Sequence, residues 1–202
     1  MESEARYGDE PTYFVEPPKS TSRVKIKKLH PDAVMPTKAT PQSIGYDLYV
    51  KQDICIEHTR QVIPLGFAIE LPENIEAKIE PRSGFSSKGI EGFALKSGSS
   101  VEYRLDGVHI SNGANEELWQ RIDKAERFNA DVLVGKIDPD YRGEVGVIIR
   151  NNEPGKPFLI AKGTRIAQMT FYPVAQFPGG FEVVEELSET ERADGGFGHS
   201  GT

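Results

Sequence analysis

Short apolar segments alternate with turn residues along most of the chain. Apolar and charged side chains nearly alternate over residues 24–29, as on a strand with one buried face. Further apolar segments follow, most of them separated by Pro or Gly, at 46–50, 62–63, 67–71, 75–79, 132–137, 145–150, 158–161 and 166–172. Many short strands at this spacing predict an antiparallel β-sandwich or barrel.

One stretch departs from this rhythm. Apolar positions alternate on both sides of Asp106-Gly107, and this pair predicts a hairpin over 101–110, because a type I′ turn needs positive φ at both central residues. Apolar residues then recur at helical spacing from position 118, which predicts a helix over 115–128. We therefore expect an insert of about 91–129 that carries a hairpin and a helix. A long surface loop is the alternative.

The two ends of the chain differ from the middle. Residues 1–22 are polar and aperiodic, which predicts a disordered arm before a β domain at 23–187. Residues 188–202 are rich in glycine and contain Arg192 and Phe197. An arginine and a phenylalanine among glycines are typical of an arm that closes over a ligand, although a frayed terminus has a similar composition.

Charge and cysteine content narrow the function. The chain has 24 Lys and Arg against 31 Asp and Glu, for a net charge of −7, which argues against nucleic-acid and membrane partners. A single cysteine excludes a disulfide scaffold and a CxxC zinc site. The charged start of the chain does not resemble a leader, so we expect an intracellular protein, cytoplasmic or nuclear.

Four segments carry candidate chemistry. Residues 81–84 (PRSG) combine an arginine, a hydroxyl and a flexible backbone, as in a small anion cradle, although a surface turn looks similar. Residues 135–143 (GKIDPDYRG) predict a hairpin whose tip carboxylate aligns a water, with an ordinary acidic turn as the alternative. In 162–168 (KGTRIAQ), Gln168 enters a packed region and needs a partner. In 45–48 (GYDL), Asp47 orients a neighbour or touches the water shell of a metal.

Taken in order, these four segments and the C-terminal arm resemble a known family. Residues 45–48, 81–84, 135–143, 163–168 and 192–198 are similar to the five motifs of the trimeric deoxyuridine triphosphatases (dUTPases). The resemblance runs from residue 23 to the C-terminus, apart from the insert. It implies a jelly-roll-like β-sandwich that forms a homotrimer, with each active site built from three subunits and the C-terminal arm closing over a neighbour's site.

The resemblance also implies an activity. The family hydrolyses dUTP to dUMP and pyrophosphate, with Mg²⁺ on the triphosphate, which limits uracil in DNA and supplies dUMP for dTMP synthesis. Asp138 would activate the water that attacks the α-phosphate, and Tyr141 would pack against the deoxyribose. The substrate-binding positions carried over are Arg82, Ser83, Gly84, Gly135, Lys136, Ile137, Tyr141, Gly146, Gln168, Arg192, Phe197 and Gly198. No residue is expected to bind the metal directly, and Asp47 is a candidate for its outer shell.

Departures from the family pattern leave other readings open. Ala193 and His199 replace the usual glycine and small hydroxyl residue of the arm. The related dCTP deaminases carry a catalytic glutamate ten residues after the aspartate, where this chain has Ile148, so a deaminase is disfavoured. A regulatory interaction protein that acts through its insert, with an unknown protein partner, is a further alternative.

Overall fold

Short strands make up most of the molecule. The structure is a computed structural model that describes residues 23–57, 59–95, 100–104, 107–111 and 125–190. Its strands are β1 (Lys25–Lys28), β2 (Tyr46–Tyr49), β3 (Ile54–Ile56), β4 (Arg60–Pro64), β5 (Phe67–Glu70), β6 (Ile75–Glu80), β7 (Ile90–Ala94), β8 (Ser100–Arg104), β9 (Gly107–Ser111), β10 (Glu126–Phe128), β11 (Ala130–Leu133), β12 (Gly135–Ile137), β13 (Gly146–Asn151), β14 (Phe158–Ile160) and β15 (Arg165–Pro173). The one helix of the described residues is α1 (Ser83–Lys88). The all-β class predicted from the spacing is confirmed.

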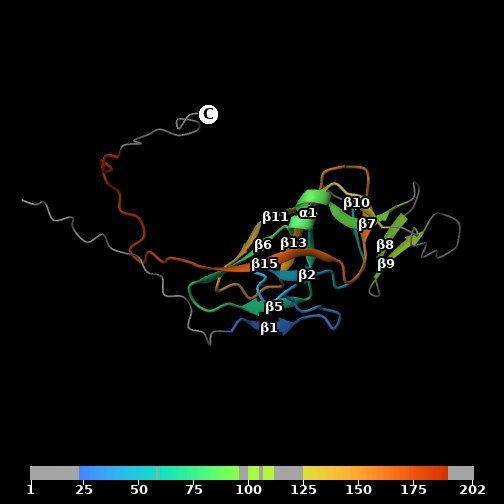
Figure 1. The fold of residues 1–202 in the computed structure, drawn as a ribbon, viewed down its shortest axis with the longest axis horizontal. Coiled ribbons are helices and arrows are strands. Elements are labelled where there is room, and N and C mark those ends of the chain that lie inside the picture. The colour runs from blue at the N-terminus through green and yellow to red at the C-terminus, as the bar shows by residue number, and fades with distance from the viewer. Residues whose placement is uncertain (1–22, 58, 96–99, 105–106, 112–124, 191–202) are drawn as a thin grey trace, which may run out of the picture.

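The strands form several small sheets around one apolar core (Figure 1). Two sheets have four strands, in the orders β12-β6-β15-β2 and β10-β7-β14-β3, and a third has the order β11-β13-β4. Along β6, inward Ile75, Ala77 and Ile79 alternate with more exposed Glu and Lys residues. Phe67 and Phe158 are fully buried in the core, and each such side chain stabilises the fold by about 1.5–3 kcal/mol.

The segment 132–137 is two strands, not the single strand that its apolar run predicts. β11 pairs with β13, whereas β12 pairs with β6 in a different sheet. Val132 and Ile137 are both buried, yet an odd spacing of five would place them on opposite faces of one regular strand. The chain therefore has to break between them, and it does so at exposed Val134. The predicted hairpin over 135–143 is also wrong, because β12 and the next strand, β13, belong to different sheets.

The insert region is partly described. β8 and β9 pair antiparallel, with Arg104 opposite Gly107. The predicted helix 115–128 is wrong at its end, because residues 126–128 are strand β10, paired with β7. Phe128 stacks on Phe158, with ring centroids 4.4 Å apart, so core packing overrides the helical spacing here. The rest of that segment up to 124 lies outside the described residues, as does the predicted arm 1–22.

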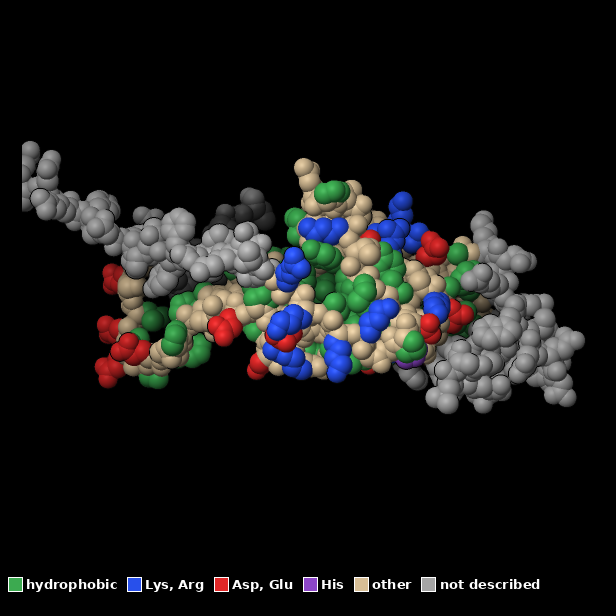
Figure 2. Space-filling model, turned by 90° about the horizontal axis from the view of Figure 1, so that it is seen from below, with side chains coloured by type: hydrophobic (Ala, Val, Ile, Leu, Met, Phe, Trp, Pro, Cys, Tyr) green, Lys and Arg blue, Asp and Glu red, His purple; other side chains and the backbone are tan. Residues whose placement is uncertain are grey.

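The C-terminal segment after β15 leaves the body, at the left of Figure 1. Between 174 and 190 it has no strand or helix, and its apolar side chains Phe177, Phe181, Val183 and Leu187 are exposed. Figure 2 shows this segment as a mixture of apolar and acidic side chains. Within the described part of the chain, no helix is long and apolar enough to cross a membrane.

Candidate active site

Three of the motif segments meet around the middle of one sheet. Gln168 on β15 lies opposite Asp47 on β2 and, on its other side, opposite Glu80 on β6. Residues 81–84 follow directly after Glu80 and lead into α1. The sheet order β12-β6-β15-β2 therefore brings together segments that are more than thirty residues apart in the sequence.

A nearly buried carboxylate joins two of these segments. Asp47 is 6% exposed, and its Oδ1 pairs with Arg82 Nε at 2.7 Å. Its Oδ2 accepts a hydrogen bond from Arg165 Nη1 at 3.3 Å. One negative charge thus holds two guanidinium groups, so the group keeps a net positive charge that favours an anion.

Gln168 occupies its place because Gly45 leaves room for it. Its Nε2 donates to the Pro81 carbonyl oxygen at 3.2 Å. A Cβ added at Gly45 would lie 2.5 Å from Gln168 Oε1. The partner that the sequence required for Gln168 is therefore the backbone just before Arg82, and the first glycine of the GYDL segment provides the space.

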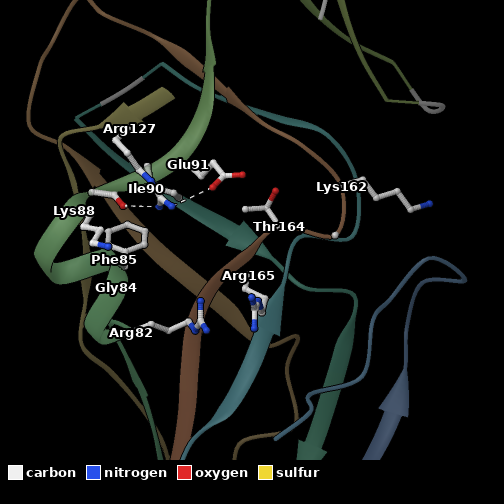
Figure 3. Close-up of a pocket in the computed structure, with 12 residues that line it drawn as sticks. Arg82, Gly84, Phe85, Lys88, Ile90, Glu91, Arg127, Lys162, Thr164 and Arg165 are labelled. Carbon is white, nitrogen blue, oxygen red and sulfur yellow. Dashed lines mark hydrogen bonds and ion pairs between the residues drawn. The ribbon is translucent and has the colours of Figure 1, made fainter. Parts of the chain in front are cut away.

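A pocket of about 450 Å³ opens beside α1 (Figure 3). Its cationic lining residues are Arg82, Lys88, Arg127, Lys162 and Arg165, and among the described residues Glu91 is the one acidic side chain that lines it. Gly84 in the first turn of α1 also lines it. Arg82 and Arg165 lie side by side at one end of the pocket, as Figure 3 shows. This excess of positive charge in a concave site is suited to bind a phosphate-bearing ligand.

The predicted catalytic aspartate lies elsewhere, on a compact turn after β12. Asp138 is exposed, and its carbonyl oxygen accepts a hydrogen bond from the Tyr141 N–H at 3.1 Å. Arg142 Nη1 donates to the carbonyls of Pro139, at 2.6 Å, and Tyr141, at 2.9 Å. The turn is thus fixed by its own residues while Asp138 faces solvent.

These two groups of residues are separated within one chain. Ile137 lies opposite Ala77 on β6, and β12 runs antiparallel to β6. Asp138 therefore leaves the sheet at the end remote from Arg82, which follows Ala77 by five positions. At about 3.3 Å per residue, the two ends are about 17 Å apart along the strand. A single ligand cannot touch both groups in a single copy unless it spans that distance.

The other predicted site residues divide between the two groups or lie outside them. Ser83 begins α1 next to Arg82, and Gly135, Lys136 and Ile137 form β12. Gly146 begins β13, opposite Pro64. Arg192, Phe197 and Gly198 lie outside the described residues. Among the described residues, no three His, Cys, Asp or Glu side chains are grouped as a direct metal site requires.

Comparison with known proteins identifies the family. The dUTPase family model matches residues 31–98 and 123–201. A deoxyuridine 5'-triphosphate nucleotidohydrolase of Hydrogenobaculum sp. is 38% identical over 89% of this chain and 98% of its own length. The chain belongs to the dUTPase family.

Solved structures agree with that assignment at the level of the fold. The dUTPase of Staphylococcus bacteriophage 80alpha with dUpNHpp has a TM-score of 0.65 and 24% identity, and covers 90% of this chain and 100% of its own. A variant dUTPase of phage phi11 of S. aureus, described with a structural Mg(II) ion, has a TM-score of 0.57 and 19% identity, and covers 82% of this chain and 98% of its own.

The family match also gives a shorter sequence range for the insert. The segment between its two matched parts is 99–122, shorter than the predicted 91–129. The structure is consistent with the shorter range, because β7 pairs with β14 as well as β10 and so belongs to a four-stranded sheet of the dUTPase body.

Sequence reasoning missed several cations of the pocket. Arg165 lies within the 163–168 motif but is not among the predicted site residues. Its position at the start of a strand, two residues after Gly163, is the sequence feature that could have indicated a role in the site. The register of β15 against β2 shifts between Arg165 and Ala167, and this irregularity is not visible in the sequence. Lys88 and Arg127 are far apart in the chain, and no motif contains them both.

Proposed function

We propose that this protein hydrolyses dUTP to dUMP and pyrophosphate. The observation that carries the proposal is the family match combined with a cationic pocket built from the PRSG segment and Arg165. In the reaction, water forms a bond to the α-phosphorus while the bond from that phosphorus to the bridging oxygen of the β-phosphate breaks. Pyrophosphate leaves with the bonding electrons.

The residues after β12 would activate the water and recognise the nucleoside. The Asp138 carboxylate accepts a proton of the attacking water and aligns its oxygen with the α-phosphorus. The exposed Tyr141 ring packs against the deoxyribose and leaves no room for a 2′-hydroxyl. β12 is the edge strand of its sheet, so the backbone groups on its outer side are available to bind the uracil.

The pocket residues would hold the triphosphate. Arg82 is pre-oriented by Asp47 and donates to phosphate oxygens, together with the Ser83 hydroxyl, the Gly84 backbone and Gln168. Mg²⁺, when bound to the phosphates, neutralises oxygen charge and favours departure of the pyrophosphate. In the C-terminal arm, Arg192 would reach the γ-phosphate, and Phe197 would stack on the base beside Gly198.

We also propose that the active site is shared between copies in a homotrimer. The separation of Asp138 from Arg82 within one chain supports this, because a second copy can bring its turn to the first copy's pocket. Exposed Phe177, Phe181 and Leu187 support it too, since apolar side chains on an extended segment call for a covering surface.

The activity is tested by pyrophosphate release from dUTP. Asp138→Ala should abolish release, whereas Asp140→Ala, which removes a carboxylate from the same exposed turn, should retain most of it. Both variants should keep the oligomeric mass and melting temperature of the unmodified protein. Full activity of Asp138→Ala would refute the mechanism, and an unmodified protein that leaves dUTP intact would refute the function.

The shared site is tested by complementation. Asp138→Ala and Arg82→Ala subunits are each expected to be inactive alone. After denaturation and refolding together, mixed trimers contain sites with an intact turn from one subunit and an intact arginine from another. Activity should therefore return. Mixed trimers that form but remain inactive would show that both groups act within one chain.

A further inference from the structure

The ring of Tyr141 is tied to the interior of the molecule through Glu144. The Tyr141 hydroxyl donates a hydrogen bond to the Glu144 carbonyl oxygen at 3.1 Å. The carboxylate of the same Glu144 accepts from Lys51 Nζ at 2.9 Å and from the Gly66 N–H at 2.6 Å. We propose that Glu144, held by Lys51, is a positioning residue for Tyr141 and thereby sets the preference for deoxyribose over ribose. The proposal rests on the proposed dUTP hydrolysis.

The Glu144 carboxylate is held in place by Lys51 and Gly66. The Lys51 side chain is 12% exposed and the Glu144 side chain 35%, so the ion pair is partly shielded from water. Gly66 has a φ of +81° and would place a Cβ 2.9 Å from the Lys51 Cδ atom. Only a glycine therefore lets its backbone N–H and the lysine reach one carboxylate oxygen together.

The Tyr141 side of Glu144 is equally constrained. A Cβ at Gly143 would overlap the Tyr141 hydroxyl and ring, so the tyrosine folds back over the glycine that precedes Glu144. Its hydroxyl then reaches the Glu144 carbonyl. The carbonyl that binds the tyrosine hydroxyl and the carboxylate that is anchored belong to the same residue. A displacement of Glu144 therefore also moves the hydrogen-bond acceptor of Tyr141.

The chain directly after Glu144 is held by hydrogen bonds that do not involve the Glu144 side chain. The next residue, Val145, donates its N–H to the Phe67 carbonyl at 2.8 Å, and its own carbonyl accepts the Leu65 N–H at 2.9 Å. Val145 is also buried in the core. Loss of the carboxylate therefore removes the bonds that attach the turn to the body at Glu144, while the turn keeps its internal hydrogen bonds and Val145 keeps its own.

The consequence for selectivity follows from the place of Tyr141. A ring that rejects a 2′-hydroxyl by contact must be held to within a fraction of the width of that group. A more mobile tyrosine ring still packs against the sugar, but it can move aside and admit the 2′-hydroxyl of ribose. Removal of the anchor should therefore weaken dUTP binding and narrow the difference between dUTP and UTP, with less change in the chemical step.

The experiment compares kcat and KM for dUTP and UTP in Glu144→Ala, Glu144→Gln and Lys51→Met. Glu144→Ala and Lys51→Met should raise KM for dUTP and lower the dUTP/UTP ratio of kcat/KM by about tenfold, the effect of losing one well-placed hydrogen bond. Glu144→Gln keeps an acceptor for both donors and should retain most of the selectivity. Glu153→Ala, which removes the exposed ion pair with Lys156, is the matched control and should change neither value.

A double-mutant cycle separates positioning from general destabilisation. If Glu144 acts through the tyrosine hydroxyl, Tyr141→Phe and Tyr141→Phe/Glu144→Ala should have the same dUTP/UTP ratio. Additive losses, or a Glu144→Ala variant with lower melting temperature and an unchanged ratio, would overturn the proposal. The proposed function fails separately, if the unmodified protein does not hydrolyse dUTP. An active unmodified protein with an unaltered ratio in Glu144→Ala refutes only the positioning role.

Discussion

Replacement of Asp47 by asparagine is the sharpest test of how the cationic pocket is organised. The carboxylate is 6% exposed and contacts Arg82 at 2.7 Å and Arg165 at 3.3 Å. Asparagine has nearly the same shape, but its amide NH₂ would face one of the two guanidinium groups, donor against donor. The substitution therefore removes the charge and one acceptor without creating a cavity.

The expected cost follows from these contacts. Hydrogen bonds to charged groups contribute about 1.5–3 kcal/mol each. Arg165 is half exposed, so its share is reduced by solvent screening. We expect the free energy of unfolding to fall by about 2 kcal/mol. For the ligand, a disordered Arg82 loses most of one charge-assisted bond to phosphate, which corresponds to a rise in KM of about tenfold or more.

Urea unfolding at a fixed protein concentration measures the first effect, and KM for dUTP measures the second. A titration of Mg²⁺ at saturating dUTP then separates two roles of Asp47. If the carboxylate holds the arginines, KM rises and the half-saturating Mg²⁺ concentration is unchanged. If it belongs to the outer shell of the metal, that concentration rises instead.

The control for this substitution is Asp131→Asn, which alters an exposed carboxylate bonded to the Asn152 side chain. It should leave stability and KM close to those of the unmodified protein. An Asp47→Asn variant as stable as this control, with unchanged KM, would refute the reasoning that the carboxylate organises the pocket.

Three further predictions concern the body of the protein. Gly89→Ala should destabilise the fold by more than about 2 kcal/mol, measured by urea unfolding, because φ is +75° and a Cβ would overlap the Phe128 carbonyl. Burial raises the pKa of Cys55 to about 12, so a thiol reagent at pH 8 should label it only after unfolding. The hydrogen bond from Lys136 lowers the pKa of Glu76. The ionised carboxylate therefore stabilises the fold above the ordinary glutamate pKa, and this stabilisation is lost as the pH falls from that value through the lowered pKa. Between pH 6 and about pH 3, a Glu76→Gln variant should therefore lose less stability than the unmodified protein.

The strand pattern was predictable from the sequence where one face of a strand is buried. The alternation of β6 and the apolar runs of β5, β13 and β15 identify those strands, with bounds that differ by one or two residues. β3 was missed because Ile54, Cys55 and Ile56 are all buried and show no alternation. The break between β11 and β12 is not visible in the sequence, because Val132 and Ile137 are both apolar and both reach the core, although from different sheets. The segment therefore reads as one apolar strand.

The site was predictable as a set of motifs and not as a geometry. The order of the motifs predicts Arg82, Asp138 and Gln168 as site residues, but sequence order contains no information on sheet order. Only the register of β6 against its two neighbours shows that Gln168 lies beside the PRSG segment and that Asp138 does not. Likewise, no periodicity connects Lys51 with Glu144, which are 93 residues apart and meet through tertiary packing.

The net charge of the chain is a poor guide to the field at the pocket. Residues 23–181 hold 21 Lys and Arg against 20 Asp and Glu, so the excess of negative charge resides in the two terminal segments. In water, charges are screened over about 8 Å at physiological ionic strength. The five cations of the pocket, by contrast, lie at its wall, and in the described part of the chain three carboxylates, Asp32, Asp47 and Glu91, pair with four of them, so an excess of positive charge remains. A triphosphate therefore meets a local positive field although the whole chain is acidic.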